Sequence, residues 1–162
     1  GPKPAAELVH AATRWPDDPS GVRLLQRHFH RLTPLVPLDT EASGLMVLTQ
    51  DGRVWRRLTE DADEIEQEFV VEVGGGIAPD GLRKLNQGLH YGGRALPPCK
   101  VSWQNEIRLR FAIKGAQPGQ LRDMCGQVGL EVVAIRRIRI GKVSMAKMPV
   151  GTWRYLPVGE KF

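Results

Sequence analysis

The stretch that decides the fold reads Pro37-Leu38-Asp39-Thr40-Glu41-Ala42-Ser43-Gly44-Leu45-Met46-Val47-Leu48-Thr49-Gln50-Asp51-Gly52. Asp39 stands in a polar loop, and the apolar run 45–48 that follows Gly44 predicts a fully buried strand. Residues 49–52 are typical of a turn that leads into a helix. A side chain keeps its geometry best where the backbone under it is rigid, so Asp39 is a candidate nucleophile or base.

Outward from this stretch, helical and strand patterns alternate irregularly. Apolar residues at helical spacing predict helices over 22–32, 51–61, 79–88 and 118–129. Strands are expected at 66–73, 89–96, 100–104, 107–113, 131–145 and 153–157, with a bend at Gly141 in the long one. These elements predict an α+β fold with a mixed, mostly antiparallel sheet.

Composition places the chain among globular proteins. With 162 residues, 41% hydrophobic and 25% charged, we expect one domain over 1–162 and, by default, a monomer. No apolar run approaches a membrane span and no signal-peptide pattern opens the chain, so we expect a cytoplasmic protein with no membrane partner. Cys99 and Cys125 are expected to be small buried groups in a reduced compartment rather than a disulfide.

Charge favours a polyanionic partner. The net charge is +5 and the pI is about 9.6, which fits nucleic acid but also a solvated basic surface. Arg136, Arg137, Arg139 and Lys142 lie on the predicted strand 131–145, where Arg137 and Arg139 would share a face. That face is either an exposed sheet edge kept soluble by charge or a phosphate contact.

Other candidate sites are weak. Gly74-Gly75-Gly76 lacks the pattern of a phosphate-binding loop and predicts a turn. His28 and His30 would lie on different faces of a helix, so we expect no shared metal ion. The tryptophans are expected in the core or at its rim.

Four motifs in order resemble the RNA pseudouridine synthases, most closely the RsuA/RluB/RluF branch. They are Leu38-Asp39 with Gly44-Leu45, Leu48-Thr49 and Asp51-Gly52; the segment 66–73; the segment 120–124 with Gly129 and 137–141; and the ending 151–156. Lys3-Pro4 is similar to the opening segment of that family. The resemblance implies a bent sheet flanked by helices around a central cleft. It also implies RNA as partner, ribosomal RNA ahead of transfer RNA, and no metal or other cofactor.

The resemblance also assigns roles. A uridine is flipped into the pocket, Asp39 starts cleavage of its glycosidic bond, and the uracil is rejoined through carbon. Arg122 resembles the basic residue that pairs with that carboxylate, and Phe69 occupies the place of the ring that packs on the base. Arg137, Arg139 and Lys142 would lie on the RNA side.

The sequence departs from the family pattern at several places. Pro37 stands where the family has Arg, Phe69 where this branch has Tyr, and the segment 114–119 lacks the usual cations. No S4-type RNA-binding domain precedes the motifs, so the chain is either a catalytic fragment or a compact divergent member.

Three functions stay open. The first is isomerisation of uridine to pseudouridine in RNA. The second is a catalytically impaired RNA-binding or ribosome-assembly factor that retains the fold. The third is a hydrolase that uses Asp39 with a second carboxylate, for which Glu41 is too close in sequence to be assigned.

Overall fold

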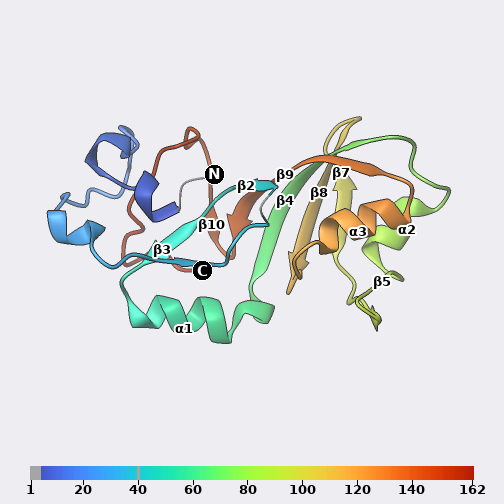
Figure 1. The fold of residues 1–162 in the computed structure, drawn as a ribbon, viewed down its shortest axis with the longest axis horizontal. Helices are drawn as coiled ribbons and strands as arrows, with labels where there is room; N and C mark the ends of the chain where they lie inside the picture. Colours follow the sequence, from blue (N-terminus) through green and yellow to red (C-terminus); the bar gives the residue numbers. More distant parts are fainter. Residues whose placement is uncertain (1–4, 40) are drawn as a thin grey trace.

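A six-stranded mixed sheet forms the centre of the molecule (Figure 1). The computed structural model describes residues 5–39 and 41–162, so Lys3, Pro4 and Thr40 lie outside the described residues. The strand order is β10-β9-β4-β8-β7, and β2 pairs with β9 in parallel, whereas the other neighbours are antiparallel. The strands are β2 (Ala42–Gly44), β4 (Glu66–Gly74), β7 (Lys100–Trp103), β8 (Arg108–Lys114), β9 (Glu131–Ile140) and β10 (Val143–Ser144).

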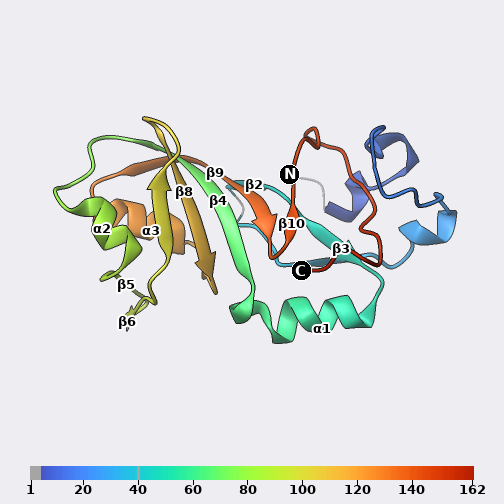
Figure 2. The same cartoon turned by 180° about the vertical axis from the view of Figure 1, so that it is seen from behind.

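Helices and two small sheets surround this centre. Helices α2 (Gly81–Asn86) and α3 (Gln120–Gln127) cover one face of the sheet, as Figures 1 and 2 show together. Strands β1 (Thr33–Leu35) and β3 (Val47–Thr49) pair beside α1 (Gly52–Glu60), and β5 (His90–Tyr91) pairs with β6 (Arg94–Ala95). Four 3-10 turns complete the list: η1 (Ala5–Leu8), η2 (Ala11–Thr13), η3 (Gln26–Phe29) and η4 (Ala62–Glu64).

The core consists of two hydrophobic clusters. The larger lies between the sheet and the pair α2 and α3, because alternate residues of β8 and one side of α3 point into it. From these two elements it takes Leu109, Phe111, Ile113, Leu121, Met124 and Cys125. The smaller cluster joins Leu35, Leu58, Ile65 and Ile140.

The predicted α+β class with a mostly antiparallel sheet is confirmed, and three of the predicted helices are present. The Asp51 side chain caps α1 by accepting a hydrogen bond from the Arg53 N–H at 2.8 Å. Among the described residues, the helices are too short or too polar to cross a membrane. Cys125 is buried and Cys99 half-buried, as expected, and burial raises their pKa values to about 12 and about 11.

The helix predicted over 22–32 is wrong. Only η3 forms there, and the Phe29 side chain contacts the C-terminal segment instead of contributing to a helical face. Phe29 meets the edge of Trp153 with ring centroids 5.7 Å apart. The strand predicted at 153–157 is likewise reduced to a single bridge between Arg14 and Trp153.

Two strand predictions need correction. The run 45–48 is half-buried and only its second half is a strand, because β2 ends at Gly44 and β3 begins at Val47. The predicted long strand 131–145 is a hairpin of β9 and β10 rather than one bent strand. Gly141 adopts a positive φ of 55° in its turn, which a glycine tolerates without strain.

Candidate active site

Asp39 lies in the short connection between β1 and β2, and its side chain is exposed. The carbonyl of Asp39 accepts a hydrogen bond from the Ala42 N–H at 2.9 Å, which closes the loop as a turn. Ala42 then pairs with Ile135 in the parallel register of β2 and β9. The central sheet therefore fixes the residues that follow Asp39.

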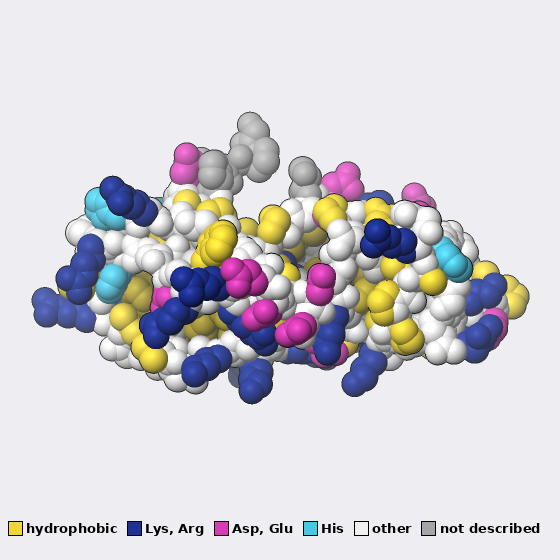
Figure 3. Space-filling view, turned by 90° about the horizontal axis from the view of Figure 1, so that it is seen from below, with side chains coloured by type: hydrophobic (Ala, Val, Ile, Leu, Met, Phe, Trp, Pro, Cys, Tyr) yellow, Lys and Arg dark blue, Asp and Glu magenta, His cyan; other side chains and the backbone are white. Residues whose placement is uncertain are grey.

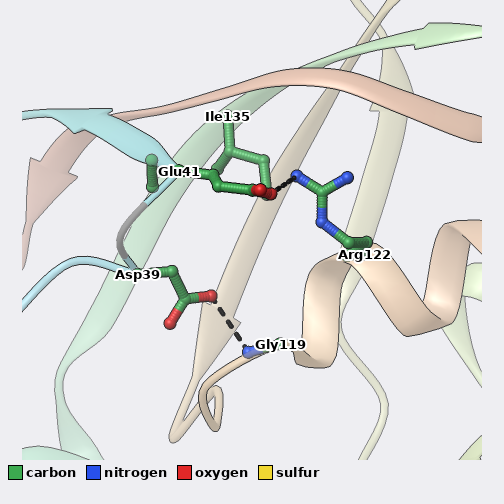
Figure 4. A pocket seen from close by; sticks show the side chains of 6 residues that line it. Asp39, Glu41, Gly119, Arg122 and Ile135 are labelled. Atoms are coloured by element: carbon green, nitrogen blue, oxygen red, sulfur yellow. Dashed lines mark hydrogen bonds and ion pairs between the residues drawn. The ribbon is translucent and has the colours of Figure 1, made fainter.

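The amino end of α3 holds the Asp39 carboxylate. Gly119, the residue before α3, donates its N–H to Asp39 Oδ2 at 2.9 Å (Figure 4). Its φ is 77°, and a Cβ there would lie 3.1 Å from Tyr91 Oη, so the position favours glycine. The N-terminal end of a helix carries partial positive charge, which suits an ionised carboxylate.

A pocket opens between the Asp39 loop and α3. Its volume is about 370 Å³, within the range of small-molecule sites and sufficient for one nucleobase. Figure 4 shows Asp39 and Glu41 on one side and Arg122 on the other. The described lining residues are Asp39, Glu41, Ala42, Gly119, Arg122 and Ile135.

Arg122 lies in the pocket, but it does not pair with Asp39. Its Nη2 is 2.7 Å from Glu41 Oε2, and its Nη1 donates to the Val132 carbonyl at 3.4 Å. The predicted ion pair between Arg122 and Asp39 is therefore corrected. Asp39 accepts a hydrogen bond from the Gly119 N–H, and Arg122 pairs with Glu41.

Phe69 does not line the pocket. It is 8% exposed and belongs to the larger hydrophobic cluster, opposite Phe111 in β8 and Arg137 in β9. Ile135, a lining residue, belongs to the same cluster, and Ala42 packs against it. In this structure Phe69 is thus part of the core that supports the pocket, and its ring is not open to a base.

Arg137 is buried rather than on an RNA surface. Only 1% of it is exposed, and its Nε and Nη2 donate to the Leu45 carbonyl at 2.9 and 2.6 Å. Its Nη1 donates to Gln67 Oε1 at 3.2 Å. Burial lowers the pKa of Arg137 to about 10. The predicted RNA contact is wrong because this side chain holds the backbone just after β2.

A β-bulge separates Arg137 from Arg139. Arg137 pairs with Phe69 but Arg139 with Glu68, so Ile138 is an extra residue in β9. The two arginines therefore lie on opposite faces, contrary to the prediction. Arg139 lies on the face away from the pocket.

On that face Arg139 is engaged by two carboxylates. Its guanidinium is 2.5 Å from Glu66 and 2.9 Å from Glu68, and hydrogen bonds from Arg139 and Arg110 hold the pKa of Glu68 below its ordinary value. Lys142, in the turn between β9 and β10, is exposed and has no ion pair among the described residues.

Two residues of the site were not predicted from the sequence. Glu41 was considered only as a second acid, and no pattern linked it to Arg122. Gly119 lies in the segment 114–119 that lacks the usual cations, although a glycine in the first turn of a predicted helix is itself a signal of a special backbone position. Within 5–39 and 41–162, no group of three or more His, Cys, Asp or Glu is placed to hold a metal ion.

Comparisons with known proteins point in one direction, although no family model matches the chain. The dual-specificity RNA pseudouridine synthase RluF of Salmonella typhi is 30% identical over 133 residues, which are 82% of this chain and 46% of that protein. The ribosomal large subunit pseudouridine synthase B of Yersinia pestis is 28% identical over 164 residues, 95% of this chain and 50% of that protein. The chain thus spans about half the length of these relatives.

A solved structure shares the fold. It is described as a pseudouridylate synthase and superposes with a TM-score of 0.73 at 21% identity, covering 84% of this chain and 60% of the other.

Proposed function

The chain belongs to the RNA pseudouridine synthases, and from this premise we propose that it converts a specific uridine of structured RNA to pseudouridine. Ribosomal RNA is the first candidate substrate, because one relative is named for the large ribosomal subunit, and transfer RNA is the second. We further propose that residues 1–162 form one catalytic domain that acts as a monomer in the cytoplasm.

The observation that carries this proposal is the setting of Asp39. Its carboxylate is exposed at a pocket and accepts a hydrogen bond from Gly119 at the amino end of α3. Such a hydrogen bond orients the carboxylate, as a nucleophile or base requires. A uridine flipped out of its stack would place its base in the pocket beside this group.

The proposed reaction needs only this carboxylate and a bound base. Asp39 starts the cleavage of the bond between ribose carbon and uracil nitrogen, the released uracil turns, and a carbon of the ring is joined to the ribose. One C–N bond is replaced by one C–C bond, and a proton moves from that carbon to the ring nitrogen. Because no group is gained or lost, the proposal includes no cofactor.

Arg122 lies across the pocket from Asp39 and pairs with Glu41. The Arg122 side chain is 45% exposed, so it can bind substrate from the pocket wall while Glu41 orients it. Phe69 contributes indirectly, by supporting the pocket from the core. Lys142 is the one of the three cations assigned to RNA that is both exposed and without an ion pair among the described residues.

A pseudouridine assay on transcribed large-subunit ribosomal RNA tests the proposal. We expect wild-type protein to produce pseudouridine and Asp39→Asn to lose at least about a thousandfold in rate, because the acid that starts the reaction is neutralised. Pseudouridine is measured by chemical labelling or by mass after RNA digestion, and RNA affinity is measured in parallel.

Glu41→Gln is the matched control. It removes the other carboxylate of the same pocket, and we expect it to slow the reaction by no more than about tenfold, the range of a weak exposed ion pair. If wild-type protein binds the RNA but forms no pseudouridine, the proposal fails. The chain is then an RNA-binding or ribosome-assembly factor with this fold.

A further inference from the structure

The segment that leads to Asp39 carries no carboxylate. From Ser20 to Leu38 there is no Asp or Glu, whereas the segment contains Arg23, Arg27, Arg31, His28 and His30. Figure 1 shows this part of the chain, around η3, at one end of the molecule. Figure 3 shows Lys, Arg and His side chains gathered at the same end.

The three arginines of this segment are exposed and unpaired. Arg23, Arg27 and Arg31 have no ion pair and no side-chain hydrogen bond with any other residue of 5–39 and 41–162. Two arginines of β8, by contrast, are neutralised: Arg108 by Glu72 at 2.7 Å and Arg110 by Glu68 at 3.0 Å. The segment 20–38 therefore carries positive charge that no described carboxylate neutralises.

The backbone of the turn that carries Arg27 is held in place. The Gln50 side-chain amide donates to the carbonyls of Arg27, at 2.8 Å, and of His30. Gln50 follows β3, and β3 pairs with β1, which leads into the Asp39 loop. Phe29 is fixed in addition by its contact with Trp153. These contacts tie the backbone at Arg27 and His30 to the strand pair that leads into the Asp39 loop.

We infer that Arg23, Arg27 and Arg31 form a docking surface for RNA backbone phosphates outside the pocket. This rests on the proposed function only for the identity of the partner. Three exposed, unpaired guanidiniums on a segment without carboxylates complement the negative charge of a nucleic-acid backbone. The surface binds RNA that flanks the flipped uridine and sets its orientation, and it does not touch the reacting base.

The test is the salt dependence of RNA binding. We expect Arg23→Ala/Arg27→Ala/Arg31→Ala to raise the Kd for transcribed large-subunit ribosomal RNA by about tenfold or more at 0.1 M salt. The slope of log K against log salt should become shallower by about 2 to 3, since each lost phosphate contact removes about 0.7 to 0.9. The rate at saturating RNA should stay within about twofold of wild type.

A matched control removes the same charge from the other end of the molecule. Lys84, Arg94 and Lys100 lie on α2, β6 and β7, are exposed and have no ion pair among the described residues. Lys84→Ala/Arg94→Ala/Lys100→Ala should leave the slope within about 0.5 of wild type. Arg23→Lys/Arg27→Lys/Arg31→Lys should retain the wild-type slope, because the slope depends on the number of phosphates neutralised by Lys or Arg.

Two outcomes overturn the inference. One is an unchanged slope in the alanine variant, and the other is an equal change in the control variant, which would mean that net charge alone matters. If the three arginines bind an acidic protein instead, the salt dependence of RNA binding is unchanged in the alanine variant, and this result counts against the inference. Failure of the proposed function is separate, because it appears as missing pseudouridine in wild-type protein whatever the slopes.

Discussion

At the scale of single residues, Arg137 shows how a cation can be part of the core. It is almost fully buried, and three of its hydrogen bonds go to the Leu45 carbonyl and the Gln67 side chain. A buried charge is costly unless its donors are satisfied. The Leu45 carbonyl is likewise satisfied by this side chain, so each group depends on the other.

Replacing Arg137 should therefore weaken both the fold and the pocket. We expect Arg137→Met to reduce the free energy of unfolding by about 2–4 kcal/mol, because the Leu45 carbonyl loses its donors. Pseudouridine formation should fall as well, since β2 carries the residues after Asp39. Urea unfolding and single-turnover rates measure the two effects. A midpoint of urea unfolding equal to that of the wild-type protein would contradict this account.

The pocket residues show what sequence can and cannot decide at this scale. Asp39 and Arg122 do line one pocket, as the motif resemblance implied. The guanidinium nevertheless pairs with Glu41, because two carboxylates two residues apart are equivalent for any argument from sequence. Only the path of the loop, which turns the Asp39 carboxylate toward Gly119, separates them.

At the scale of elements, the amino end of α3 combines a left-handed backbone conformation with a hydrogen bond to Asp39. Gly119 has positive φ and points its N–H at Asp39, whereas Gly126 lies inside α3 with open space where a Cβ would stand. The backbone at position 119 therefore requires glycine, whereas position 126 has room for a Cβ, although both belong to the same short helix or its cap.

Alanine substitutions should separate these two glycines. We expect Gly119→Ala to reduce the free energy of unfolding by about 1–2 kcal/mol and to slow pseudouridine formation, because the left-handed backbone is strained and the N–H moves. Gly126→Ala should stabilise the protein by about 0.5–1 kcal/mol without changing the rate. Thermal unfolding and initial rates check both, and a rate for Gly119→Ala equal to wild type would refute the role of this N–H.

Strands were predicted well where their alternation is regular. β4 and β8 follow from period-two and β-branched patterns, and the buried residues of β8 are the alternating ones. β9 shows the limit, because the extra residue Ile138 reverses the faces of everything after it. Counting by two along the sequence cannot detect such an insertion, so the faces of Arg137 and Arg139 were predicted incorrectly.

At the scale of the whole molecule, buried thiols give stability a pH dependence. Burial raises the pKa of Cys99 to about 11 and of Cys125 to about 12, against an ordinary 9.0. In the unfolded chain both thiols lose their protons near pH 9, while the folded state keeps them protonated. The unfolded state is therefore favoured as the pH rises above about 9.

This predicts a decrease in the free energy of unfolding between pH 8 and pH 10. The lowered pKa of Arg137, about 10, acts in the opposite direction but only above that range. Denaturant unfolding at steps of about half a pH unit measures how the free energy of unfolding depends on pH. Cys99→Ala/Cys125→Ala should be less stable at pH 8, but its free energy of unfolding should decrease less with pH. A decrease as steep as that of wild type would mean that other groups cause the pH dependence.

The overall architecture was predictable because local patterns and the motif order agreed. The N-terminal segment was not, since its apolar residues have helical spacing, yet Phe29 contacts Trp153 and Arg14 forms a bridge with the same residue. Contacts between residues more than a hundred positions apart leave no mark on local periodicity. For the same reason, local periodicity did not predict that Phe69 is buried in the core instead of lining the pocket.

The two hydrophobic clusters share one long strand. β9 contributes Val132 and Ile135 to the larger cluster and Ile140 to the smaller, and Ile65 stands directly before β4. The two clusters are therefore connected through continuous strands of one sheet, and no linker separates them within the described residues.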